Sequence, residues 1–88
     1  MNYKVIWTAS AKKDLRKIMG NVSNKKFDEI SKSPLSIIFP DQFQLDEYRP
    51  DCRKIIIGNY KVLYQFNENT IFIIRVFNTL QDPSKSLR

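Results

Sequence analysis

The sequence lacks histidine, has a single cysteine, and contains no apolar run of the length that crosses a membrane. The absence of histidine excludes zinc sites built on imidazole and acid–base catalysis by histidine. The lone cysteine, Cys52, cannot form an internal disulfide, which fits a reducing compartment. A spanning helix needs roughly 18 apolar residues, and no signal-peptide pattern opens the chain, so we expect a cytoplasmic protein without a membrane partner.

Charge is plentiful but unevenly distributed. The chain has 15 Lys and Arg against 9 Asp and Glu, a formal net charge of +6. Residues 1–33 and 53–88 are basic, whereas residues 34–52 contain four acidic residues and one arginine. This layout has two interpretations that the sequence leaves open: an anionic partner such as nucleic acid or an acidic protein, and plain solubility.

The first third of the chain predicts a strand followed by a helix. Residues 3–7 are β-branched and aromatic, which is typical of a strand, and Thr8 or Ser10 can cap the helix that follows. Gly20 and Asn21 end this helix. Its expected apolar face consists of Ala11, Leu15, Ile18 and Met19, and its expected polar face of Lys12, Lys13, Asp14, Arg16 and Lys17. The four cations are typical of a solvated face, and attraction of DNA, RNA or an acidic partner is the alternative.

The rest of the chain completes an α+β domain. Ser23 caps a second helix, which Pro34 ends. Residues 53–57, 60–66 and 71–78 predict three strands joined by short turns, and hairpin turns make them antiparallel neighbours. We therefore expect a single two-layer domain over the whole chain, 1–88, in which the N-terminal strand and two helices pack on an antiparallel β-meander.

A connector, residues 34–51, separates the helices from the meander and carries three prolines. We expect it to pack on the core because it contains Ile37, Ile38, Phe39, Phe43 and Leu45. Its acids, Asp41, Asp46, Glu47 and Asp51, lack a recognised metal-ligand spacing, so no metal and no cofactor are implied. We expect these acids to have a solubilising and capping role.

Cations recur along the predicted strands at Lys54, Lys61 and Arg75. The period of two places Lys61 on one face with Leu63 and Gln65, and Arg75 on one face with Ile73 and Phe77. Each cation alone is typical of a solvated sheet face. Together on one open face they would grip a phosphate backbone and stabilise the charge that develops at a scissile phosphate.

The cysteine, two of the tyrosines and the tryptophan are expected to be core residues. Cys52 is expected to be a buried, inert thiol because no histidine is present to activate it. Tyr60 and Tyr64 alternate with Val62 as core residues do, and Trp7 is expected in the core.

Several of these runs, taken in order, carry a resemblance. The runs are 51–55 (DCRKI), 60–64 (YKVLY), 74–78 (IRVFN) and the ending Gln81-Asp82-Pro83. Together with the strand and helix at the start, they resemble the RelE/ParE toxin superfamily of bacterial toxin–antitoxin systems over nearly the whole chain. The resemblance implies a RelE/ParE-like fold, a role of the plasmid-stabilization type, and growth inhibition that a cognate antitoxin protein neutralises.

The resemblance implies one of three activities. RelE-like members enter the ribosome and cut mRNA, which would make this chain a metal-independent, ribosome-dependent endoribonuclease. ParE-like members inhibit DNA gyrase and are not nucleases. A degenerate, non-toxic member that only binds an antitoxin is the third possibility.

The resemblance also assigns roles to individual residues. Lys54 matches a family lysine on the first meander strand, and Lys61 replaces an arginine on the next strand. Arg75 fits the ParE-like pattern, and we group it with these two lysines as the candidate catalytic set. Residues expected to contact nucleic acid or the target are Arg53, Asn78, Gln81, Lys85 and Arg88. Two positions depart from the family pattern, because Ile56 stands where RelE-like members have a second lysine and Leu80 stands where an arginine is customary.

Overall fold

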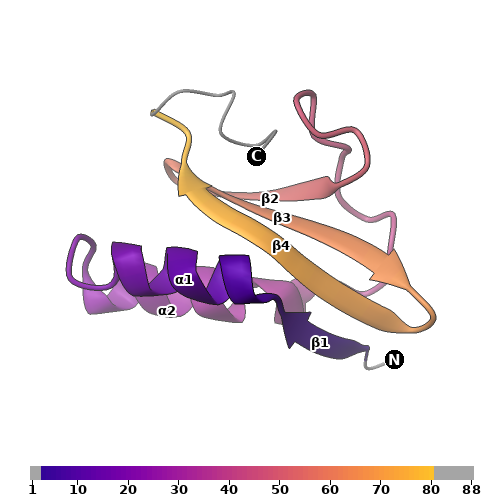
Figure 1. The fold of residues 1–88 in the computed structure, drawn as a ribbon, viewed down its shortest axis with the longest axis horizontal. Coiled ribbons are helices and arrows are strands. Elements are labelled where there is room, and N and C mark those ends of the chain that lie inside the picture. The colour runs from indigo at the N-terminus through magenta and orange to yellow at the C-terminus, as the bar shows by residue number, and fades with distance from the viewer. Residues whose placement is uncertain (1–2, 81–88) are drawn as a thin grey trace.

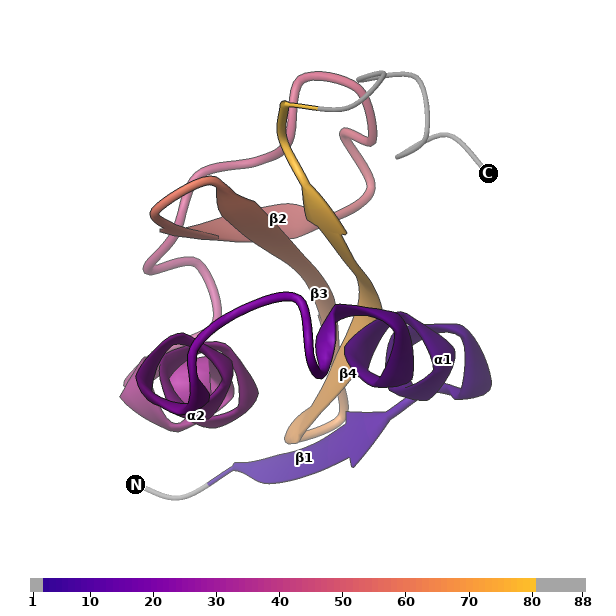
Figure 2. The ribbon, with the colours of Figure 1, turned by 90° about the vertical axis from the view of Figure 1, so that its left-hand side faces the viewer.

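The computed structural model describes residues 3–80, and these form a sheet with two helices on one of its sides (Figures 1 and 2). The elements in chain order are β1 (Lys4–Trp7), α1 (Ala9–Ile18), α2 (Asn24–Lys32), a 3-10 helix (Ser33–Ser36), β2 (Arg53–Ile57), β3 (Tyr60–Asn67) and β4 (Thr70–Asn78). The strand order is β1-β4-β3-β2, with β1 parallel to β4 and the other neighbours antiparallel. The two-layer α+β arrangement and the meander are confirmed. Neither α1 nor α2 has the length and apolar content that a membrane-spanning helix requires.

Both helices begin where the sequence places a cap. The Thr8 side chain accepts a hydrogen bond from the Ala11 N–H, and the Ser23 hydroxyl accepts one from the Lys26 N–H. Each oxygen satisfies one of the backbone donors that a helix start leaves unpaired. Helix α1 ends at Ile18, slightly before the expected Gly20, whose positive φ of 94° then turns the chain towards α2.

The core lies between the helices and the sheet. Its buried side chains are Ala11 and Ile18 of α1, Ile30 of α2, Ile37 of the connector, and Ile55, Val62, Tyr64, Ile71, Ile73 and Val76 of the sheet. Trp7 and Tyr60 pack against it, as expected, and are partly buried. Each fully buried apolar side chain contributes roughly 1.5–3 kcal/mol, so this one cluster supplies most of the driving force for folding.

Strand β4 carries a bulge that changes which residues share a face. Leu63 of β3 lies opposite Arg75, but the next residue, Tyr64, lies opposite Ile73. Ile74 is therefore an extra residue in β4, and the strict period of two breaks there. The expected grouping of Arg75 with Ile73 is wrong for this reason.

Beyond the bulge, α1 takes over from β1 along the edge of β4. Strand β1 pairs with β4 only as far as Ile73. The Thr8 N–H then donates to the Ile73 carbonyl at 3.1 Å, and the Asp14 carboxylate accepts the Val76 N–H at 2.9 Å. Helix α1 thus satisfies backbone groups that a strand would otherwise pair.

Two expectations about apolar side chains are wrong. Met19 lies past the end of α1 and is 59% exposed, so it does not belong to the apolar face of the helix. In the connector, Ile37 is buried and Phe43 packs edge-on against Tyr64, but Ile38, Phe39 and Leu45 are more than half exposed. Connector hydrogen bonds, such as the one from the Ile38 N–H to the Gln42 side chain, fix this segment without burying those three side chains.

Candidate functional site

The face of the sheet away from the helices is partly covered by the connector. A second, small apolar cluster lies there, made of Cys52, Leu63 and Phe77 with Ile74 against it. Beside it is a pocket of about 280 Å³, which we call the outer-face pocket. Its walls are Glu47, Tyr48, Lys54, Ile56, Lys61, Phe77 and Thr79. Two of the three candidate catalytic cations, Lys54 and Lys61, therefore meet in one pocket.

Lys61 is not a solvated strand cation. Its side chain is buried, and its Nζ donates to the Asp46 carboxylate at 2.5 Å. The same nitrogen lies 5.5 Å from the ring centroids of both Tyr48 and Phe77. The ammonium group is thus enclosed by one carboxylate and two aromatic rings, which is the environment of a structural ion pair.

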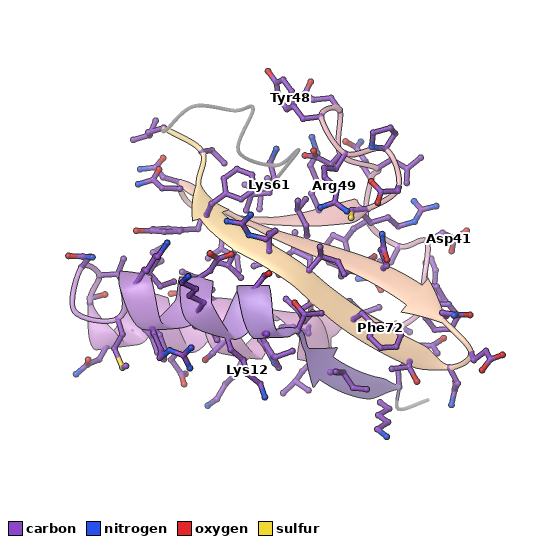
Figure 3. The ribbon with its side chains drawn as sticks, in the orientation of Figure 1. Lys12, Asp41, Tyr48, Arg49, Lys61 and Phe72 are labelled. Carbon is purple, nitrogen blue, oxygen red and sulfur yellow. The ribbon has the colours of Figure 1, made fainter. Side chains whose placement is uncertain are left out.

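Asp46 is the buried centre of this arrangement, so the solubilising part of its expected role is wrong, whereas the capping part is confirmed. It is 1% exposed and also accepts the backbone N–H groups of Tyr48 and Arg49, at 3.0 Å and 2.8 Å. Burial by itself raises the pKa of Asp46. The hydrogen bonds from Lys61 and from these two backbone groups outweigh burial, so the pKa of Asp46 lies below its ordinary value. Figure 3 shows Lys61, Tyr48 and Arg49 on the side of the sheet away from α1.

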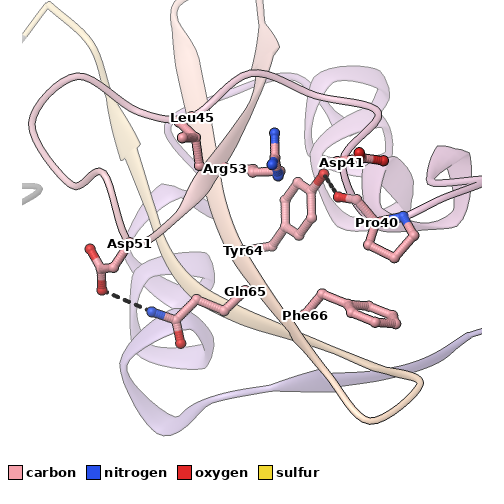
Figure 4. Close-up of a pocket in the computed structure, with 8 residues that line it drawn as sticks. All are labelled: Pro40, Asp41, Leu45, Asp51, Arg53, Tyr64, Gln65 and Phe66. Atoms are coloured by element: carbon pink, nitrogen blue, oxygen red, sulfur yellow. Dashed lines mark hydrogen bonds between the residues drawn. The ribbon is translucent and has the colours of Figure 1, made fainter.

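The turn 46–51 is attached to β3 at both ends, since Asp46 binds Lys61 at its start and Asp51 binds Gln65 at its end. Arg49 makes a bidentate ion pair with Asp51, at 3.1 Å and 2.8 Å. The Asp51 carboxylate also accepts the Gln65 side-chain amide at 2.8 Å (Figure 4), and the Arg49 hydrogen bond holds the pKa of Asp51 below its ordinary value. Lys61 and Gln65 of β3 therefore fix the two ends of one turn.

Within residues 3–80, three ion pairs on the outer face balance one another in charge. The three carboxylates Asp46, Glu47 and Asp51 accompany the three cations Arg49, Lys54 and Lys61. Lys54 is the least constrained of these cations, since its Nζ lies 4.0 Å from the exposed Glu47. These three ion pairs offer a phosphate backbone little net positive charge.

Arg75 lies elsewhere, between β4 and α1. Its Nε donates to Asp14 at 2.8 Å and its Nη2 donates to the same carboxylate at 3.3 Å. Asp14 is 6% exposed, so its expected place on the polar face of the helix is wrong. The sequence spacing could have indicated that Asp14 is buried, because Asp14 lies three residues after Ala11 and four before Ile18, on the same side of the helix as these two buried residues. The structure does not bring Arg75 into the outer-face pocket.

The other predicted contact residues are dispersed. Arg53 donates to the Phe43 carbonyl at 2.7 Å and lines a separate pocket of about 280 Å³ with Pro40 and Tyr64 (Figure 4). Asn78 accepts the Leu80 N–H and borders a groove beside Arg75. Gln81, Lys85 and Arg88, and with them the ending 81–83, lie outside the described residues.

Cys52 is where the sequence led us to expect it. The thiol is 1% exposed in the outer apolar cluster, and burial raises the pKa of Cys52 above its ordinary value. A protonated, inaccessible thiol is a poor nucleophile, so Cys52 is a packing residue.

Comparison with known proteins places this fold in a family. Residues 5–83 match the family model for the ParE toxin of the type II toxin–antitoxin system parDE, and no curated protein matches significantly. The isolated E. coli RelE toxin is 20% identical, with a TM-score of 0.69 and coverage of 98% of this chain and 94% of that one.

Two toxin–antitoxin assemblies contain similar chains. The intact E. coli RelBE complex matches at 21% identity, TM-score 0.66 and coverage of 88% and 96%. The chromosomal ParDE system of P. aeruginosa matches at 16% identity, TM-score 0.65 and coverage of 86% and 95%. Identities this low establish a shared fold only, whereas the family model covers most of the sequence. The chain therefore belongs to the ParE toxins of type II toxin–antitoxin systems, within the RelE/ParE superfamily.

Proposed function

We propose that this toxin inhibits DNA gyrase by binding it, that it does not cut RNA, and that a cognate antitoxin protein neutralises it. The observation that carries the proposal is the buried ion pair of Lys61 with Asp46, which occupies the cation that an RNA-cutting site would need. The antitoxin is proposed because similar chains occur in the E. coli RelBE and P. aeruginosa ParDE assemblies.

A nuclease without histidine or metal needs cations that can turn to the reacting phosphate. If Lys61 turned to a phosphate, the Asp46 carboxylate would remain buried and uncompensated, which costs about 3–5 kcal/mol. Arg75 is held by Asp14 on another part of the molecule. Of the three candidate catalytic cations, Lys54 alone is placed to meet a phosphate on the outer face.

The outer-face pocket has features of a protein-binding surface. Tyr48 is 40% exposed and Ile56 is 54% exposed, and both line the pocket. Exposed aromatic and aliphatic side chains at a shallow hollow are the usual anchors of protein interfaces. Ile56 is also the position at which RelE-like members have a lysine, so this surface is more apolar than theirs at that point.

Supercoiling of relaxed plasmid by purified gyrase tests the proposal. The toxin should inhibit the reaction, and Tyr48→Ala should weaken inhibition about tenfold or more because it removes an anchor. Phe39→Ala is the matched control, since Phe39 is an exposed aromatic residue of the connector that does not line the pocket. Unimpaired supercoiling at high toxin concentration would contradict the proposal.

A second candidate, ribosome-dependent mRNA cleavage, is favoured by the presence of Lys54 and Lys61 in one pocket with Tyr48. Mapping of mRNA ends in cell-free translation, with and without ribosomes, separates the two. New ribosome-dependent cuts that Lys54→Ala abolishes would replace the gyrase proposal with this one. If neither assay responds while an antitoxin still binds, the chain is a non-toxic member.

A further inference from the structure

Within residues 3–80, helix α1 carries a cluster of exposed cations that no ion pair accounts for. Four cations, Lys12, Lys13, Arg16 and Lys17, are all exposed. At 3.6 residues per turn they occupy one side of the helix, opposite the buried Ala11 and Ile18. Figure 3 shows Lys12 on the side of α1 that is turned away from the sheet. We call these four side chains the α1 basic face.

Among residues 3–80, no carboxylate pairs with any member of the α1 basic face. The one acid within this stretch of helix, Asp14, points to the other side and is held by Arg75. Helix α2 differs, because its Lys26 and Lys32 pair with Glu29 and Asp28 on its own surface. Within the part of the chain that the structure describes, no ion pair therefore compensates the positive charge of the α1 basic face.

This placement of charge only partly helps the helix to form: Arg16 and Lys17 lie in the last turn, where the negative end of the helix dipole favours cations, but the other features are unfavourable. Lys12 and Arg16, and likewise Lys13 and Lys17, are like charges four residues apart, which is unfavourable. The first turn of α1 contains no acid, although an acid is what the positive end of the helix dipole favours there. The helix dipole thus accounts in part for Arg16 and Lys17 but not for Lys12 and Lys13, whereas a ligand would account for all four cations of the α1 basic face.

We infer that the α1 basic face binds the phosphate backbone of duplex DNA. A row of cations without an apolar centre suits a polyanion, because contacts to phosphates are electrostatic and require no anchor side chain. An acidic protein surface is the poorer match, since protein interfaces are built around buried apolar anchors. The choice of DNA over RNA rests on the proposed function, because gyrase holds duplex DNA.

The direct test measures binding of the toxin to a labelled random-sequence DNA duplex by fluorescence anisotropy over a series of salt concentrations. If four phosphates are contacted, the logarithm of the association constant should fall with the logarithm of salt with a slope of about −3 to −4. The variant Lys12→Ala/Arg16→Ala should bind more weakly and reduce this slope by about 2.

The matched control is Lys25→Ala/Lys32→Ala in α2, which lowers the net charge by the same two units away from the α1 basic face. It should retain the binding and the slope of the wild type. Equal losses in the two variants would overturn the inference, because only net charge would then matter. Tighter binding to RNA of the same length than to the DNA duplex would overturn the choice of DNA.

The inference and the proposed function can fail separately. The binding assay contains no gyrase, and thermal melting shows whether each variant is folded. DNA binding without inhibition of supercoiling would leave the inference standing and refute the proposed function. If the wild-type toxin inhibits supercoiling but binds DNA no more tightly than Lys12→Ala/Arg16→Ala does, the proposed function stands and the inference is refuted.

Discussion

Two buried carboxylates, Asp14 and Asp46, each hold a strand cation, but they attach different kinds of structure to the sheet. Asp14 fastens a regular helix to β4 through Arg75 and also accepts the Val76 N–H. Asp46 fastens an irregular turn to β3 through Lys61 and accepts two N–H groups of that turn. In both cases the acid joins a strand cation to backbone groups that need a partner.

The two pairs differ in how completely water is excluded. The side chain of Arg75 is 21% exposed, whereas that of Lys61 is 8% exposed. A partly exposed guanidinium can still be hydrated if its partner is lost, but a buried ammonium cannot. The outer-face pair is therefore the more sensitive of the two, although it holds a loop and the other holds a helix.

The largest expected effect is that of Asp46→Asn. The substitution leaves the Lys61 ammonium buried without a counter-charge, so the free energy of unfolding should fall by about 3–5 kcal/mol in urea denaturation. Glu47→Gln is the control, because Glu47 is an exposed neighbouring acid and should change stability by less than about 1 kcal/mol. Adding Lys61→Met to Asp46→Asn should restore most of the loss. A double variant as unstable as the single one would show that the turn, and not the buried charge, is responsible.

The next effect is that of Asp14→Asn, for which we expect a loss of about 2 kcal/mol. The amide keeps an oxygen for the Val76 N–H but removes the charge that Arg75 binds. Asp28→Asn serves as control, since Asp28 pairs with Lys32 on the exposed surface of α2. If Asp14→Asn destabilises the protein as much as Asp46→Asn does, the difference in side-chain exposure does not determine how much each ion pair contributes to stability.

A smaller loss, about 1 kcal/mol, is expected for Arg75→Lys. A lysine keeps the charge but provides a single point of contact in place of the two guanidinium hydrogen bonds to Asp14. Equilibrium denaturation again measures the change. A loss as large as that of Asp14→Asn would mean that the fork geometry, more than the charge, holds α1 to β4.

The last and smallest effect is the pH dependence of the stability that the Asp46–Lys61 pair contributes. The pKa of Asp46 is lower in the folded protein than its ordinary value, so the pair stabilises the fold above about pH 4. This contribution is lost as the pH falls through the folded-state pKa. The gap in stability between the wild type and Asp46→Asn should therefore be constant above about pH 5 and narrow below about pH 4. A gap that stays unchanged down to pH 2 would argue against an ionised Asp46.

The sequence predicted those features of the fold that depend on a few neighbouring residues. The caps Thr8 and Ser23, the short turns between the strands, and the three meander strands are encoded within a few residues of where they occur. The family was also within reach, because several short runs occur in a fixed order. The buried state of Cys52 follows from its type and its place next to a strand.

The ion pairs were not predictable in the same way. Asp46 and Lys61 are 15 residues apart, and Asp14 and Arg75 are 61 apart, so each pair forms only when the tertiary structure brings its members together. The bulge at Ile74 has no marker such as glycine, and this extra residue separates Arg75 from the face of Ile73, with which the period of two had grouped it. Of the three candidate catalytic cations, Lys54 and Lys61 share a pocket and Arg75 lies outside it, and their catalytic roles stay predictions.

The order of the strands bears on self-association. The two edge strands of the sheet are its shortest, β1 with four residues and β2 with five. The long strands, β3 and β4, are interior, and the part of β4 beyond β1 is bonded to α1. The connector further shortens the free edge of β2 through the bridge between Leu45 and Arg53. Within the described residues, a second copy of the sheet finds no long unpaired strand edge to extend, which protects this sheet from edge-to-edge aggregation.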